Sequence, residues 1–107
     1  MKQFDKYQFL REYKEDLIIR CKDIITYVDS DLLIRDMLND FTHEYIDNEC
    51  IYYADCWAIC CEIANNDFEI NQTGETAKNI TELAYWALYD LSCSIDIDLL
   101  IESVKKQ

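Results

Sequence analysis

Residues 30–46, SDLLIRDMLNDFTHEYI, place apolar side chains three and four positions apart. These apolar residues are Leu33, Ile34, Met37, Leu38, Phe41 and Tyr45. Because such steps fall on one face of an α-helix, the stretch predicts an amphipathic helix with these side chains on its buried side. Asp29 or Ser30 can cap its first turn with a side-chain oxygen.

The segments on either side carry the same period. The first three predicted helices cover residues 2–28, with a break allowed near Tyr13, residues 30–46 and residues 53–64. A fourth helix is predicted from Thr73 or Thr76 to Ser92, and a last one is capped by Ser94. In the first helix Tyr7 is expected on the buried side. The third is apolar almost all round, which is typical of a helix at the centre of a bundle. The polar triplet at residues 47–49 is expected to end the second helix.

Glycine and proline are almost absent, since the chain has one glycine, Gly74, and no proline. Tight turns between antiparallel strands usually need glycine at positive φ, so helices are favoured. With 107 residues, half of them apolar, there is enough material for one core. We therefore expect a single acidic helical domain over residues 1–107. Its fold class is all-α, a compact bundle of four to five helices with at most one short extended segment, near Ile51 or Phe68. Because a domain of this size is marginally stable, a homodimer would be a natural supplement.

Negative charge dominates the middle of the chain. Residues 23–104 hold eighteen Asp and Glu against two cations, Arg35 and Lys78, a local charge of −16 in a chain whose net charge is −12. Solubility needs a net charge of only about 2–8, and the excess repels itself. The excess favours a positively charged partner. Its sign excludes nucleic acid and anionic membrane surfaces as direct partners, and no run reaches the ~18 apolar residues that span a bilayer.

The expected second helix carries a row of carboxylates. Asp36, Asp40 and Glu44 follow one another at i,i+4, and Asp47 continues at i+3. Carboxylates four residues apart are separated by about 6 Å along a helix, a charge density comparable to that of phosphates on DNA. Like charges at this spacing cost roughly 0.2–0.5 kcal/mol per pair, and only Arg35 stands near enough to offset them. The row is either a solvated face of an acidic protein or a surface that occupies phosphate-binding cations.

A second candidate contact lies on the expected fourth helix. Trp86 stands four residues after Glu82 and four before Asp90, flanked by Tyr85 and Tyr89. Trp and Tyr are enriched at binding hot spots, and a Trp among carboxylates can stack on an arginine of a partner. The alternative is that Trp86 packs against another part of this chain or in a dimer.

Metal and catalytic interpretations are weaker. Cys56, Cys60 and Cys61 share one helix, but no CxxC pair occurs, and core packing is favoured over a metal or redox role. His43 is the single histidine, and an HExxH motif would need a second one where Asp47 stands. We expect no enzyme, no cofactor and no metal. No secretory signal is visible, so we also expect a cytoplasmic protein with reduced cysteines.

HEYID at residues 43–47, followed by IYYAD at residues 51–55, resembles a pattern in small acidic proteins encoded by bacteriophages. Size, acidity and cysteine usage also resemble phage-encoded inhibitors of bacterial defence, namely DNA-mimic anti-restriction proteins and anti-CRISPR proteins. In those groups carboxylates occupy a nucleic-acid channel of the target, and no residue role is carried over from them. The basic residues near the N-terminus and the milder net charge depart from the most extreme mimics.

These features predict a non-catalytic inhibitor of a basic nucleic-acid-binding protein of a bacterial host, a CRISPR effector or a restriction nuclease. The expected contacts are Asp36, Asp40, Glu44 and Asp47, with Glu82, Trp86 and Asp90 as a second group. One alternative is a helical adaptor or regulator that binds an ordinary protein through its aromatic residues. Another is a metal-binding or redox protein that uses Cys56, Cys60 and Cys61.

Overall fold

Five α-helices make up the part of the chain that the computed structural model describes, residues 4–53, 55–64 and 80–107. They are α1 (Lys6–Ile24), α2 (Asp31–Tyr52), α3 (Cys56–Ala64), α4 (Ile80–Ser92) and α5 (Ile97–Lys105). No strand occurs in these residues. The predicted all-α bundle of four to five helices is confirmed.

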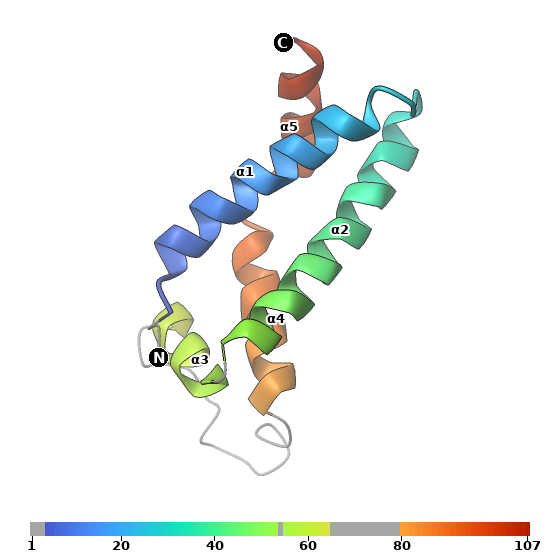
Figure 1. Ribbon diagram of the computed structural model, residues 1–107. Coiled ribbons are helices and arrows are strands. Elements are labelled where there is room, and N and C mark those ends of the chain that lie inside the picture. Colours follow the sequence, from blue (N-terminus) through green and yellow to red (C-terminus); the bar gives the residue numbers. More distant parts are fainter. Residues whose placement is uncertain (1–3, 54, 65–79) are drawn as a thin grey trace.

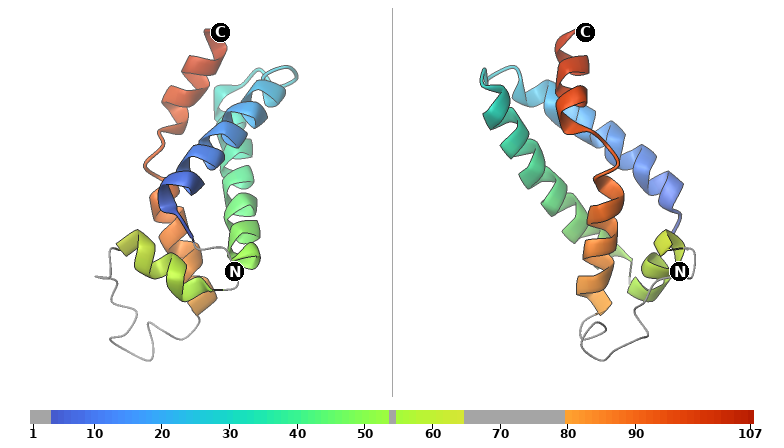
Figure 2. Two further views of the ribbon diagram at one scale, coloured as in Figure 1. Left: turned by 60° about the vertical axis from the view of Figure 1, so that its left-hand side comes forward. Right: turned by 180° about the vertical axis from the view of Figure 1, so that it is seen from behind.

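The helices α1 and α2 form an antiparallel pair, joined at one end by a short turn at residues 25–30 and diverging from it (Figure 1). Helices α4 and α5 follow one another along one side of this pair and contact both of its members (Figure 2). The short α3 packs on α4 and α1 at the end away from the turn. The long α2 therefore has α1 on one side and α4 on the other.

Side-chain oxygens fix where four of the helices begin. Asp5, Ser30, Asp55 and Asp96 accept hydrogen bonds from backbone N–H groups in the first turns of α1, α2, α3 and α5, at distances of 2.9 to 3.3 Å. Each cap contributes typically about 1 kcal/mol of stability. The prediction of Ser30 as a cap is confirmed, whereas for the last helix Asp96 takes the role expected of Ser94.

The core of the α1–α2 pair is built from two lines of side chains that advance mostly four residues at a time. On α1 the line is Phe9, Tyr13, Leu17, Cys21 and Ile24. On α2 it is Ile34, Leu38, Thr42, Ile46 and Cys50. Leu33 was expected on the buried side, but it is 51% exposed, because it lies about 100° around the helix from Ile34 and outside this line. The sequence pattern also missed Thr42, which is buried.

Two expectations about α1 were wrong. The helix is continuous through Tyr13, which is 1% exposed and belongs to the centre of the core. Tyr7 was expected inward and is exposed, because the residue that continues the buried line is Phe9.

The expected end of the second helix was also wrong. The helix continues to Tyr52, so Ile51 is helical rather than extended, and only Tyr53 leaves the helix with φ −89° and ψ 104°. The polar triplet does not break α2, because its three positions lie between Ile46 and Cys50, which both keep the buried line. The other expected extended segment, at Phe68, and the helix starts at Thr73 or Thr76 lie outside the described residues.

The third helix is not at the centre of the bundle. It buries Cys56, Ile59 and Cys60 against its neighbours, while Trp57 on its other side is 44% exposed. Helices α1, α2 and α4 already fill the middle, so α3 is left at the end of the bundle and covers it with one side.

One buried polar contact joins α1 to α2. The Tyr13 hydroxyl lies 2.8 Å from Oγ1 of Thr42, and the Thr42 hydroxyl also lies 2.9 Å from the carbonyl oxygen of Leu38. Because Thr42 has a single hydroxyl hydrogen and donates it to Leu38, Tyr13 is the donor in the contact between the helices. Burial raises the pKa of Tyr13, so this donor keeps its proton at neutral pH.

Replacing Thr42 with valine leaves the Tyr13 hydroxyl without its acceptor. We expect Thr42→Val to lower the free energy of unfolding by about 1–3 kcal/mol, and Tyr13→Phe, which removes the donor, by about 0.5–1.5 kcal/mol. Urea denaturation measures both. The double variant should cost less than the sum, since the two changes remove one shared bond. Additive costs would show that the two hydroxyl groups act independently.

Candidate partner-binding surface

The carboxylate row expected from the sequence lies on the outer face of α2. Asp36, Asp40, Glu44 and Asp47 are all exposed. At about 100° per residue, the four positions fall within an arc of about 80° of the helix surface. The fold places them there because the line from Ile34 to Cys50 takes the opposite face into the core.

None of the ion pairs in the described residues involves this row. Three ion pairs occur in the described residues: Arg35 with Asp98 at 3.7 Å, Lys105 with Asp31, and Lys106 with Glu102 at 3.1 Å. The expectation that Arg35 offsets the row was wrong, because its guanidinium turns toward α5. Within the described part of the chain, no Lys or Arg nitrogen comes within 4.0 Å of the four carboxylates.

The acidic residues therefore divide into two groups. Those with a role in holding the helices are the caps Asp5, Asp55 and Asp96 and the ion-paired Asp31, Asp98 and Glu102. Those that neither cap a helix nor form an ion pair with another described residue include Asp36, Asp40, Glu44, Asp47 and Asp90. Four of these five carboxylates lie on one face of α2, whereas Glu15, Asp16 and Asp23, which also neither cap a helix nor form an ion pair, lie on α1. Capping and ion pairing give no reason for the four to be on α2.

Aromatic rings connect this face to α4. Nδ1 of His43 hydrogen bonds with the Tyr85 hydroxyl, and the His43 ring stacks on Tyr89 with centroids 5.1 Å apart. Trp86 meets both tyrosines edge-on, at 5.2 and 5.7 Å, and remains 49% exposed. Trp86 is thus held by its neighbours while one side of its ring stays open to solvent.

The two predicted contacts meet where α2 passes α4. His43, on the same side of α2 as the row, contacts Tyr85 and Tyr89 of α4. Burial raises the pKa of Tyr85, and the charge of Asp47 raises it further. Glu82 and Asp90 are exposed one turn before and one turn after Trp86. We call the surface formed by the α2 row and by Glu82, Trp86 and Asp90 the acidic surface. Sequence reasoning missed the position of His43 in it, although its spacing of three from Asp40 and four from Asp47 puts it on the same side of the helix.

Most of the cysteines are packed in the core and take no part in the acidic surface. Core packing was predicted for Cys56, Cys60 and Cys61. It is confirmed for Cys56 and Cys60, whereas Cys61 is half-buried; Cys21 and Cys50 are buried as well. Burial raises the pKa of Cys50 to about 12 and that of Cys60 to about 11, and the neighbouring Cys56 adds to both shifts. These thiols are therefore protonated at neutral pH. No group of three His, Cys, Asp or Glu in the described residues could hold a metal ion.

Comparison with known proteins gives no match: no protein-family model, no curated protein and no solved structure is similar to this chain. Among the described helices, none combines the length and the apolar character needed to cross a membrane. Any function must therefore be inferred from the acidic surface and its surroundings.

Neutralising two carboxylates of the row should make the fold slightly more stable. We expect Asp40→Asn with Glu44→Gln to raise the free energy of unfolding by roughly 0.6–1.5 kcal/mol at low salt, because all three neighbouring like-charge pairs of the row disappear. As a control, Asp31→Asn should lower it by up to about 1 kcal/mol, since Asp31 pairs with Lys105. Urea denaturation measures both. A loss of stability in the double variant would mean that these carboxylates hold the fold together.

The buried thiols should make the fold sensitive to alkali. Above about pH 9 the unfolded chain loses thiol protons that Cys50 and Cys60 retain when folded, so stability falls as the pH rises from about 9 to about 12. Each such group can contribute up to about 1.4 kcal/mol per pH unit. Thermal denaturation under reducing conditions should show a shallower pH dependence for Cys50→Ala. The exposed Cys93 provides the control, because Cys93→Ala removes a thiol that is not buried; equal slopes in the unchanged protein and in both variants would contradict the expectation.

Proposed function

We propose that this protein is a non-catalytic inhibitor that binds a basic, nucleic-acid-binding protein through the acidic surface. The observation that supports the proposal is the exposed row from Asp36 to Asp47, which has no cap or ion-pair role within the described residues. Carboxylates about 6 Å apart along a helix present negative charge at a spacing comparable to that of a phosphate backbone. Lysines and arginines that normally hold phosphates would engage the row and so be unavailable to nucleic acid.

The mechanism is electrostatic competition, with an aromatic anchor. The net charge of −12 speeds the encounter with a basic partner, so association is fast and weakens as salt rises. Trp86 adds contact area that does not depend on charge, as expected of a residue type enriched at hot spots. The half-open ring between Tyr85 and Tyr89 suits that role.

The class of target comes from the resemblance to phage-encoded anti-defence proteins. On that basis we propose a CRISPR effector or a restriction nuclease in the cytoplasm of a bacterial host. Affinity capture from a bacterial lysate, washed at rising salt, tests this. The proposal expects a basic nucleic-acid-binding protein that is retained at low salt, released at high salt and competed off by DNA or RNA. A neutral, salt-insensitive partner would contradict it.

Reversing two charges of the row should abolish inhibition without unfolding the protein. Asp40→Lys with Glu44→Lys places cations where the partner presents its own, and like charges across an interface cost several kcal/mol. The matched control is Glu15→Lys with Asp29→Lys, which changes the net charge equally at exposed sites away from the acidic surface. Inhibition of the captured protein should survive the control and be lost in the row variant. Equal effects of the two variants would remove this face from the mechanism.

A second candidate function is supported by the exposure of Trp86. An adaptor or regulator that binds an ordinary protein, or a second copy of this chain, would rely on the rings of Tyr85, Trp86 and Tyr89. Its affinity would respond to Trp86→Ala more than to salt. An electrostatic inhibitor would show the opposite order, so one binding assay with both changes separates the two functions.

A further inference from the structure

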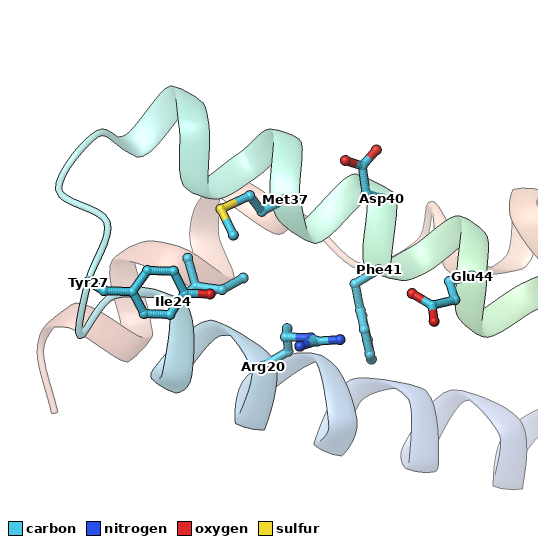
Figure 3. A pocket seen from close by; sticks show the side chains of 7 residues that line it. All are labelled: Arg20, Ile24, Tyr27, Met37, Asp40, Phe41 and Glu44. Carbon is cyan, nitrogen blue, oxygen red and sulfur yellow. The ribbon is translucent and has the colours of Figure 1, made fainter.

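A groove runs along the outer side of the α1–α2 pair. Two adjoining cavities form it, with volumes of about 220 and 430 Å³, and both are lined by Arg20 of α1 and Phe41 of α2 (Figure 3 shows the first). We call it the Arg20–Phe41 groove. It lies beside the acidic surface, because Asp40 and Glu44 belong to the α2 row and also line the smaller cavity.

The groove combines apolar walls with excess negative charge. The rings of Phe41 and Tyr45 lie 5.8 Å apart, and Ile19 of α1 is 65% exposed beside them. Four carboxylates line the two cavities, against the single cation of Arg20, which leaves a formal charge of −3: they are Asp16, Asp23, Asp40 and Glu44. Such a groove suits a side chain that is both flat and positively charged.

Arg20 shows which chemistry fits. Its guanidinium carbon lies 5.1 Å from the centre of the Phe41 ring, a cation–π contact. Figure 3 shows Arg20 extending from α1 toward this ring, with Glu44 beside the ring and Asp40 pointing away from α1. Arg20 forms no ion pair with any carboxylate of the described residues. The guanidinium group of Arg20 therefore already covers the face of the Phe41 ring, and only this weak cation–π contact holds it there.

We propose that the Arg20–Phe41 groove receives an arginine side chain of the basic partner, which stacks on Phe41 in place of Arg20. This inference rests on the proposed function and names the chemistry recognised at one edge of the acidic surface. Arginine is favoured over lysine because a planar guanidinium stacks on an aromatic face and is less strongly hydrated than an ammonium group. The charge of −3 favours the entry of a second cation. Because the groove already holds the guanidinium group of Arg20, an arginine of the partner can replace it with little reorganisation of the groove.

Peptides test the groove without knowledge of the target. The full chain, labelled with ¹⁵N, is titrated at low salt with capped hexa-arginine and hexa-lysine peptides of equal charge and followed by NMR. We expect the arginine peptide to bind about two- to five-fold more tightly, with the largest shifts at Ile19, Phe41 and Tyr45. Phe41→Leu should abolish this preference while keeping an apolar side chain, and its dispersed spectrum verifies folding. Equal affinities for the two peptides, or shifts centred elsewhere, would overturn the inference.

A pair of arginine variants tests the exchange itself. Arg20→Ala frees the ring, whereas Arg11→Ala removes the same charge from the same helix about 13 Å away and outside both cavities. The Arg20 variant should bind the arginine peptide about two- to five-fold more tightly than the Arg11 variant does. Equal affinities would mean that only net charge matters, and the exchange would be refuted.

The two proposals fail in different ways. If the acidic surface captures a basic target but the chain shows no preference for arginine, the groove inference alone is overturned. If the arginine preference is present but no salt-sensitive basic protein is captured, the proposed inhibitor function is refuted while recognition of arginine by the groove stands.

Discussion

The constraint on which the rest of the structure depends is that α2 buries one narrow line of side chains. With 22 residues α2 is about 33 Å long. The line from Ile34 to Cys50, with the half-buried Met37, Phe41 and Tyr45 beside it, leaves the four carboxylates of the row facing outward. Three neighbouring like-charge pairs on that outward face cost about 1 kcal/mol together, whereas burying a single large apolar side chain such as Leu38 contributes about 1.5–3 kcal/mol. The core therefore tolerates the carboxylate row but gains nothing from it, so a reason for the row has to be sought outside folding.

The acidity of the chain has two different physical origins. One group of carboxylates caps helices or pairs with lysine and arginine, and these contacts help to fix α1, α3 and α5 in the bundle. A second group has no cap or ion-pair role within the described residues. It includes the α2 row and Asp90, which lie beside aromatic rings, and also carboxylates of α1 such as Glu15 and Asp23. Net charge alone cannot separate the two groups, because every carboxylate of either group adds one negative charge to the net charge of −12. Sorting by local contact separates them, and the candidate site is the part of the second group that lies on α2 and α4.

Periodicity in the sequence predicted most of the helices and the outward direction of the α2 row, because both depend on neighbours three and four residues away. Periodicity could not predict contacts between residues that are far apart in the sequence. Thr42 is buried because its hydroxyl meets Tyr13, 29 residues earlier, and Arg35 leaves the row because Asp98 lies across on α5. The link from His43 to Tyr85 spans 42 residues and likewise depends on packing. The Arg20–Phe41 groove is lined by residues of both α1 and α2, so it depends on how the two helices pack, which no local sequence pattern specifies.

Long-range attraction by itself would make this protein a poor discriminator among basic partners. At physiological salt, charges are screened over about 8 Å, and Asp36 and Asp47 lie about 16 Å apart along α2. On the proposed function, the row would therefore act through several local contacts rather than as one large charge, and a partner would have to present cations at matching positions. Discrimination would then come from short-range features at the ends and edges of the row, namely the half-exposed Trp86 and the ring of Phe41. A surface of carboxylates alone would attract any basic protein, whereas aromatic rings set among them favour partners whose cations are arginines.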